Sequence, residues 1–196
     1  MSDPPVSFVG SFPDPDIALD PPLPEIALVG RSNVGKSSLL NALVGQAGLA
    51  RISSTPGKTT LLNVFRLPTF YLVDLPGYGF AVASKSARAG YRQLVEGYLR
   101  RRERLAGVVW LLDVRHDPSR DDFVMQQLLV DHERPVLAVL TKSDKLGRAA
   151  LAVRVSALAT ALRLPPDQVQ PTSSKSGLGI EELKDSIAAA AAGETL

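Results

Sequence analysis

One stretch near the start of the chain carries residue types that bind phosphate groups. It matches the pattern G-x-x-x-x-G-K-[ST], in which backbone N–H groups at a turn and at a helix start point at an anion. Lys36 is expected to reach the β- and γ-phosphates and the Ser37 hydroxyl to ligate Mg²⁺. The pattern predicts a nucleotide phosphate site, with a glycine-rich turn as the alternative. The stretch comprises Gly30, Arg31, Ser32, Asn33, Val34, Gly35, Lys36 and Ser37.

A second motif ends an apolar run further along the chain. It comprises Asp74, Leu75, Pro76 and Gly77. A carboxylate at a strand end can hold Mg²⁺ through water, and a glycine there lets its N–H approach a γ-phosphate. D-x-x-G alone is a weak signal because Asp-rich turns are common, but its place after a strand pair downstream of the first motif favours a nucleotide role.

Two later motifs contain residues that could recognise the base of a bound nucleotide. Asp144 can accept hydrogen bonds from N1–H and the 2-amino group of guanine, whereas adenine offers neither donor there. The Lys142 stem can cover the purine face, and a loop N–H before the last helix can meet guanine O6. The alternatives are a strand-end turn with solvated charges and an ordinary helix entry. The motifs comprise Thr141, Lys142, Ser143 and Asp144, then Thr172, Ser173 and Ser174.

The elements expected around these motifs alternate between strand and helix. An apolar run at 26–29 precedes the first motif and a helical pattern at 39–44 follows it. Further strands are expected at 61–67, 70–73, 108–112, 136–140 and 168–170, and helices at 87–105, 121–130, 148–162 and 180–192. This alternation predicts an α/β fold of three layers, with a mainly parallel central sheet and helices on both faces.

Composition limits the class of protein. A chain of 196 residues with 45% hydrophobic content suits one globular domain. Cysteine is absent, which excludes disulfides and thiolate metal sites. The chain lacks the pattern of a signal peptide and any run of 18 apolar residues. We therefore expect a cytoplasmic protein without membrane insertion.

Charge and proline are unevenly distributed. The first 25 residues carry five acidic and no basic residues, and the remainder carries 22 basic and 15 acidic residues. Seven of the 15 prolines lie in the first 24 residues, which predicts a Pro-rich acidic leader at 1–21, an extended arm, ahead of a domain at 22–196. Residues 85–104 carry seven basic and two acidic residues, so this helix either binds RNA phosphates or presents a solvated face.

Taken together, the motifs resemble the EngB (YihA/YsxC) family of bacterial GTP-binding proteins, within the TRAFAC class of P-loop GTPases. The resemblance rests on the phosphate stretch, Thr-Pro-Gly-Lys-Thr at 55–59, Asp-Leu-Pro-Gly-Tyr-Gly at 74–79 and Thr-Lys-Ser-Asp at 141–144, and it runs from about residue 8 to 183. The unpermuted motif order argues against the circularly permuted ribosome-assembly GTPases. The resemblance implies a Ras-like G domain.

The resemblance also implies a function and its residues. It implies a Mg²⁺-dependent GTPase that converts GTP to GDP and phosphate, acts as a switch in assembly of the large ribosomal subunit through rRNA and ribosomal proteins, and is needed for cell division and septation. Ser37, Thr59 and Asp74 would ligate the metal. The catalytic residues would be Lys36, Asn33, Thr59 and Gly77. Residues 74–77 would form the second switch, and the first would comprise Gly57, Lys58, Thr59, Thr60 and Leu61, with Thr60 a chemical alternative to Thr59.

Three positions differ from better-known GTPases or qualify the mechanism. Thr141 stands where many GTPases have Asn, and Tyr78 stands where Ras-like enzymes carry the glutamine that orients water, so turnover should be slow. Asn33 stands where potassium-stimulated GTPases hold K⁺, which leads us to hypothesise stimulation by K⁺.

We expect a monomer without a DNA partner. The alternatives are a P-loop kinase or ATPase, and a nucleotide-binding interaction protein of the division machinery without a ribosomal role.

Overall fold

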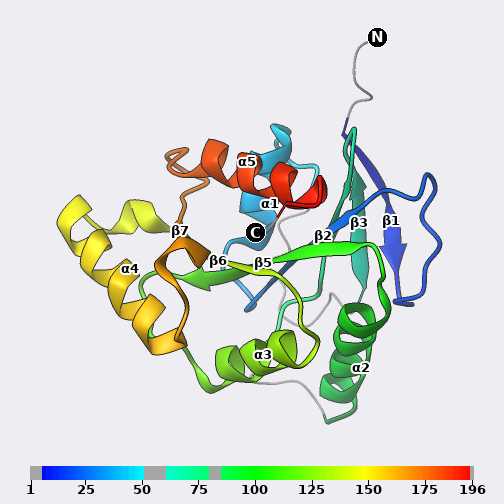
Figure 1. The fold of residues 1–196 in the computed structure, drawn as a ribbon, viewed down its shortest axis with the longest axis horizontal. Helices are drawn as coiled ribbons and strands as arrows, with labels where there is room; N and C mark the ends of the chain where they lie inside the picture. Colours follow the sequence, from blue (N-terminus) through cyan, green and yellow to red (C-terminus); the bar gives the residue numbers. More distant parts are fainter. Residues whose placement is uncertain (1–5, 51–60, 80–84, 195–196) are drawn as a thin grey trace.

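A seven-stranded β-sheet forms the centre of the molecule (Figure 1). The computed structural model describes residues 6–50, 61–79 and 85–194. The strands lie in the order β1-β3-β4-β2-β5-β6-β7. Their bounds are β1 (Ser7–Phe12), β2 (Glu25–Gly30), β3 (Leu62–Arg66), β4 (Tyr71–Asp74), β5 (Leu105–Asp113), β6 (Val136–Thr141) and β7 (Val169–Pro171).

Five of the strands run parallel. Strands β4, β2, β5, β6 and β7 form parallel pairs, β3 is antiparallel to β4, and β1 is antiparallel to β3. Every residue of β2 and β4 is buried, as is typical of unbroken apolar runs covered on both faces. Because the parallel strands end at the same edge, the loops that leave them gather there, which is where ligands bind in open α/β sheets.

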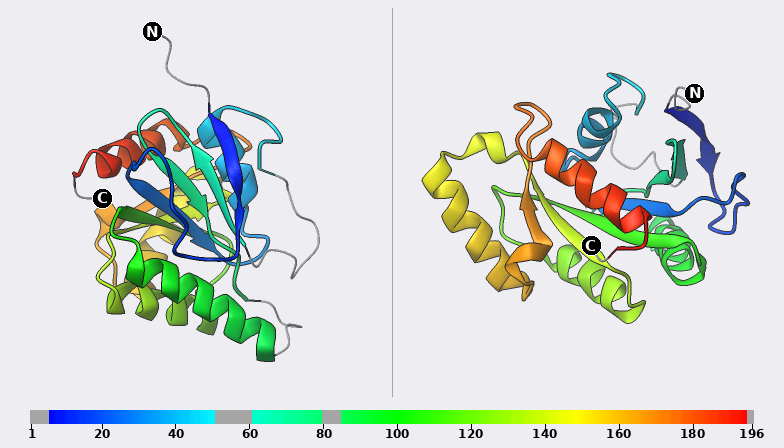
Figure 2. Two further views of the ribbon diagram at one scale, coloured as in Figure 1. Left: turned by 90° about the vertical axis from the view of Figure 1, so that its right-hand side faces the viewer. Right: turned by 45° about the horizontal axis from the view of Figure 1, so that its top comes forward.

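Helices cover both faces of the sheet (Figures 1 and 2). The pair α1 and α5 packs on one face around Leu39, Leu40 and Ile187, and α2, α3 and α4 pack on the other around Trp110. The fold prediction, three α/β layers with a mainly parallel sheet, is confirmed. Among the described residues, no helix has the length and apolarity to span a bilayer. The bounds are α1 (Lys36–Val44), α2 (Lys85–Arg101), α3 (Arg120–Asp131), α4 (Arg148–Leu162), α5 (Ile180–Ala191) and two 3-10 turns, η1 (Ser143–Lys145) and η2 (Pro166–Gln168).

Most expected elements agree with the structure to within a few residues, and α4 has the expected bounds of 148–162. The helix expected at 87–105 instead occupies 85–101. It ends earlier because the N–H of Glu25 donates to the Arg104 carbonyl at 2.8 Å and Leu105 pairs with Glu25, so the chain has already entered the sheet.

The expected extended arm takes part in the sheet. Residues 7–12 form β1, an edge strand that pairs with β3 and lies apart from the helices (Figure 2). Prolines on either side exclude a central strand but not an edge strand. The following segment is held by a hydrogen bond from the Tyr71 hydroxyl to the Pro21 carbonyl at 3.0 Å and by an ion pair between Arg101 and Asp16 at 2.9 Å.

Candidate functional site

The loop between β2 and α1 has the backbone shape that the phosphate pattern requires. Asn33 and Gly35 both have positive φ, at 64° and 106°, a conformation that Asn tolerates and Gly adopts freely. A Cβ atom on Gly30 would lie 2.9 Å from the Leu111 carbonyl oxygen, so a larger residue does not fit. The loop leads directly into α1, which begins at Lys36, the arrangement in which loop and helix-start N–H groups can bind an anion together.

Lys36 and Asp74 meet at this edge of the sheet. Their side chains form an ion pair and are 12% and 7% exposed, and the Asn63 amide lies 3.4 Å from the second Asp74 oxygen. The Asp74 carboxylate and the Ser37 hydroxyl are hard oxygen donors of the kind that Mg²⁺ prefers. Among the described residues, no cluster of three or more His, Cys, Asp or Glu could hold a metal by itself. The donor set therefore fits a Mg²⁺ that also binds nucleotide phosphates.

The second motif lies directly against the phosphate loop. The N–H of Ser32 donates to the Tyr78 carbonyl at 2.9 Å, and the N–H of Tyr78 donates to the Gly30 carbonyl at 3.2 Å. A Cβ atom on Gly77 would lie 3.2 Å from the Ser32 nitrogen. The structure thus brings Asp74, Leu75, Pro76 and Gly77 beside the loop predicted to hold the phosphates.

The first base motif is bonded to the same loop. The Thr141 hydroxyl donates to the Val34 carbonyl at 2.7 Å, and Lys142 Nζ donates to the Asn33 carbonyl at 2.8 Å. Thr141 lacks the amide of the more common Asn, yet its hydroxyl keeps a bond between the two loops. The expected phosphate and base motifs are therefore neighbours in space although more than 100 residues separate them.

Asp144 lies beside the second base motif. The Ser173 hydroxyl donates to Asp144 Oδ1 at 2.7 Å, and the N–H of Ser143 donates to the Thr172 carbonyl at 3.0 Å. The Ser173 hydrogen bond lowers the pKa of Asp144 from its ordinary value, so the carboxylate is ionised at neutral pH. Ser174 follows in the same loop and is exposed.

Asp113 is a site residue that the motif analysis missed. Its carboxylate pairs with Lys142 Nζ at 3.0 Å and with Arg115 at 2.7 Å. Burial raises the pKa of Asp113, but hydrogen bonds from Arg115 and Lys142 outweigh it and hold the pKa well below its usual range. Asp113 lines a cavity of about 410 Å³ together with Asn33 and Lys142. The available signal was its place directly after an apolar strand, at the same sheet edge as the motifs.

Part of the expected site lies outside the described residues. Gly57, Lys58, Thr59 and Thr60 belong to this part, so the first switch and the Thr59 metal ligand stay predictions. Leu61, the last residue of that expected switch, is half-buried immediately before β3.

Comparisons with known proteins agree with this geometry. Residues 25–142 match the sequence model of a family described as a 50S ribosome-binding GTPase. The chain is 51% identical over 166 residues to the probable GTP-binding protein EngB of Gemmatimonas aurantiaca, covering 84% of this chain and 81% of that protein. A crystal structure of a probable GTP-binding protein EngB matches with a TM-score of 0.72 and 23% identity, covering 87% of this chain and 100% of that one.

A further similar structure contains both a nucleotide and RNA. Era in complex with MgGDPNP and nucleotides 1506–1542 of 16S ribosomal RNA matches with a TM-score of 0.67 and 26% identity, covering 84% of this chain and 55% of that one. The family match and the 51% identity over most of the chain settle the family. The chain belongs to the EngB family of GTP-binding proteins.

Proposed function

We propose that this chain binds GTP together with Mg²⁺ and hydrolyses it to GDP and phosphate. The observation that carries the proposal is the hydrogen bond from Lys142 to the Asn33 carbonyl at 2.8 Å, because it joins the base motif to the phosphate loop at the edge where β2 and β6 end. The functional unit would be the domain at 22–196, with the leader at 1–21 contributing β1.

The proposed chemistry is mainly electrostatic. Lys36 and the loop N–H groups would stabilise charge on the transferred γ-phosphoryl group, and Gly77 would bring its N–H toward that group. Bound Mg²⁺, held by Ser37, Asp74 and Thr59, would neutralise negative charge on the phosphates. Asp144 would select guanine by accepting its two donors.

We propose slow intrinsic turnover with stimulation by K⁺. The Tyr78 hydroxyl bonds to Asp122 at 2.7 Å in the core, so Tyr78 does not replace the glutamine that orients water in Ras-like enzymes. Asn33 is exposed in the phosphate loop and has a positive φ, which leaves its amide available for a monovalent cation. Hydrolysis rates in matched K⁺ and Na⁺ buffers test this, and equal rates would reject a role for K⁺.

We also propose that the nucleotide state controls binding to the large ribosomal subunit during its assembly. Cell division and septation would depend on this role. The protein would act as a cytoplasmic monomer. The matched family is described as ribosome-binding, and the similar Era structure contains ribosomal RNA. These descriptions support an RNA-containing partner.

The basic helix α2 and the residues just after it supply a surface for such a partner, although not all of the charge there is available. Arg92 pairs with Glu96 at 3.2 Å, and Arg102 forms an ion pair with the buried Glu25. Three exposed arginines make no ion pair among the described residues, and these are the candidates for phosphate contacts: Arg88, Arg100 and Arg104.

The experiment is sedimentation of the protein with separated ribosomal subunits in a non-hydrolysable GTP analogue, GDP or no nucleotide. We expect migration with the large subunit only in the triphosphate state, and loss of that dependence in Lys36→Ala. Binding that is absent or identical in all three conditions would reject the ribosomal switch. It would favour a nucleotide-binding partner of the division machinery instead.

A further inference from the structure

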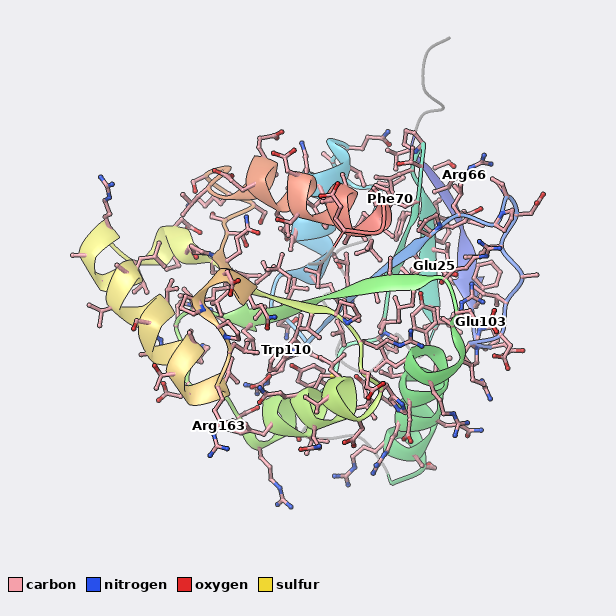
Figure 3. All side chains as sticks on the ribbon, viewed as in Figure 1. Glu25, Arg66, Phe70, Glu103, Trp110 and Arg163 are labelled. Atoms are coloured by element: carbon pink, nitrogen blue, oxygen red, sulfur yellow. The ribbon has the colours of Figure 1, made fainter. Side chains whose placement is uncertain are left out.

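The Tyr78 side chain, directly after the second motif, lies in the core. It is 5% exposed and belongs to the same cluster of buried residues as Trp110. The indole N–H of Trp110 donates to the Tyr78 hydroxyl at 2.8 Å, and that hydroxyl donates to Asp122 Oδ1 at 2.7 Å. Figure 3 shows Trp110 between the sheet and α3. The Tyr78 hydroxyl therefore joins the second motif to β5 and to α3.

The backbone of the same residue is bonded to the phosphate loop. Its N–H donates to the Gly30 carbonyl at 3.2 Å, and its carbonyl accepts from the Ser32 N–H at 2.9 Å and the Ser32 hydroxyl at 3.2 Å. Gly77 precedes it and approaches Ser32 so closely that a Cβ atom would lie 3.2 Å from the Ser32 nitrogen. Any shift of Tyr78 would therefore move Gly77 relative to the loop.

The partner of Tyr78 is itself fixed. Asp122 is 2% exposed, and its Oδ2 accepts from the Ser119 N–H at 2.7 Å and the Ser119 hydroxyl at 2.6 Å, which completes the capping box of α3. Burial, together with the Asp122 charge, raises the pKa of Tyr78 well above its ordinary value. Tyr78 consequently remains a hydrogen-bond donor at neutral pH, and its acceptor is a carboxylate that cannot turn away without breaking the cap.

We propose that Tyr78 is a positioning residue for γ-phosphate recognition, because its hydroxyl ties the second motif to α3 and β5 and thereby holds the Gly77 N–H at the phosphate loop. The inference rests on the proposed GTP binding and names a residue that sets the preference between GTP and GDP. GDP lacks the γ-phosphate that the Gly77 N–H would meet under the proposed function, so loosening Gly77 should weaken the triphosphate complex selectively.

The chain contains a matched control for this bond. The Tyr98 hydroxyl donates to Glu25 Oε2, also at 2.7 Å, and both residues are buried. Glu25 begins β2, whereas Gly30 ends it at the phosphate edge. Removing the Tyr98 hydroxyl therefore breaks an equivalent buried bond at the opposite end of the strand.

The experiment compares Tyr78→Phe with Tyr98→Phe by measuring affinities for GDP and for a non-hydrolysable GTP analogue, both with Mg²⁺. We expect Tyr78→Phe to weaken the analogue about tenfold while GDP affinity stays within about twofold. Tyr98→Phe should leave the ratio of the two affinities unchanged. Trp110 loses its hydrogen-bond acceptor in Tyr78→Phe, so its emission does not report folding, and far-UV circular dichroism with thermal unfolding checks that each variant is intact.

A second variant keeps the test decisive if Tyr78→Phe does not fold. Asp122→Asn offers a single acceptor oxygen to Tyr78 and Ser119, so it should also weaken binding of the GTP analogue more than binding of GDP. If either variant is folded and the ratio of the two affinities stays at the wild-type value, the role of Tyr78 is overturned. A wild-type protein that binds neither nucleotide would instead overturn the proposed function, and the inference with it.

Discussion

At the scale of single residues, the proposed guanine selection depends on a carboxylate that is oriented by the protein. Asp144 Oδ1 accepts from the Ser173 hydroxyl at 2.7 Å, whereas Lys145 Nζ approaches Oδ2 only to 3.7 Å. A carboxylate offers about four acceptor positions, so one bond to Ser173 leaves enough for two guanine donors. The side chain can therefore be oriented by the protein and bind the base at the same time.

Exchanging Asp144 for Asn should change base preference. The amide of the substituted side chain would present a donor where guanine also presents donors, so we expect Asp144→Asn to lose GTP affinity on the order of 100-fold and to gain affinity for xanthosine triphosphate. Competition binding with the two nucleotides measures this. Asp167→Asn, at an exposed acid in η2, is the control, and unchanged preference in Asp144→Asn would reject the base assignment.

Motif spacing predicted which residue types gather at the site because phosphate, metal and base chemistry each demand a short local pattern. It could not predict the bonds that join the motifs. Thr141 reaches Val34 across 107 positions and Ser173 reaches Asp144 across 29, and these distances in sequence carry no periodic signal. Asp113 was missed because a lone acid after a strand is common.

At the scale of elements, the position of the loop that contains Thr172 and Ser173 depends on how α5 begins. Gly179 precedes α5 as its N-cap with a φ of 68°, and a Cβ atom there would lie 2.3 Å from the Pro171 carbonyl oxygen at the end of β7. The loop that contains Thr172 and Ser173 spans the short interval between these two elements. Close contact between the α5 start and the β7 end therefore fixes the loop.

Gly179→Ala should destabilise the fold more than Gly177→Ala. Both glycines have positive φ, at 68° and 81°, so each substitution costs about 1–2 kcal/mol of backbone strain. Of the two, only Gly179 has a neighbour within 4 Å of the added Cβ atom, and its clash adds about 1–3 kcal/mol. Urea unfolding of the two variants measures the difference. Equal losses would show that the α5 contact does not constrain the loop.

Apolar runs predicted the existence and type of most elements, since buried parallel strands and core-facing helices need them. The end of α2 was predicted too late because residues 102–105 suit a helix locally, whereas pairing of Leu105 with Glu25 draws them into the sheet. Strand β1 was expected only as an extended arm, since its place is set by antiparallel pairing with β3, at least 50 residues away along the chain.

At the scale of the whole molecule, one buried ion pair links the leader, the sheet and α2. The guanidinium of Arg102 is within 3.1 Å of both Glu25 oxygens and also donates to the Ile17 carbonyl. Glu25 is 1% exposed, so this ion pair lies in the interior, away from water. Figure 3 places Glu25 near α2 and the β1 side of the sheet.

Replacing Arg102 should therefore reduce the free energy of unfolding more than replacing its neighbour Arg101. Arg102→Ala leaves Glu25 buried with only Tyr98 as a side-chain partner among the described residues, so we expect a loss of about 3–5 kcal/mol in the free energy of unfolding. Arg101→Ala breaks an exposed pair with Asp16, whose side chains are 44% and 53% exposed, and should cost less than about 1 kcal/mol. Thermal and urea unfolding measure both. A small loss in Arg102→Ala would mean that the leader is not anchored through this pair.

The same distinction between buried and exposed arginines defines the last prediction, which concerns the proposed partner surface on and just after α2. Replacing its three exposed arginines with Gln should weaken binding to the large subunit and reduce the slope of log affinity against log salt by about 2–3, since each lost phosphate contact contributes about 1. The arginines are Arg88, Arg100 and Arg104. A control replaces three exposed arginines at the start of α3, the start of α4 and the end of α4, namely Arg120, Arg148 and Arg163. Both triple variants carry the same net charge, so equal losses would indicate general attraction to RNA, whereas loss confined to the α2 variant locates the contact.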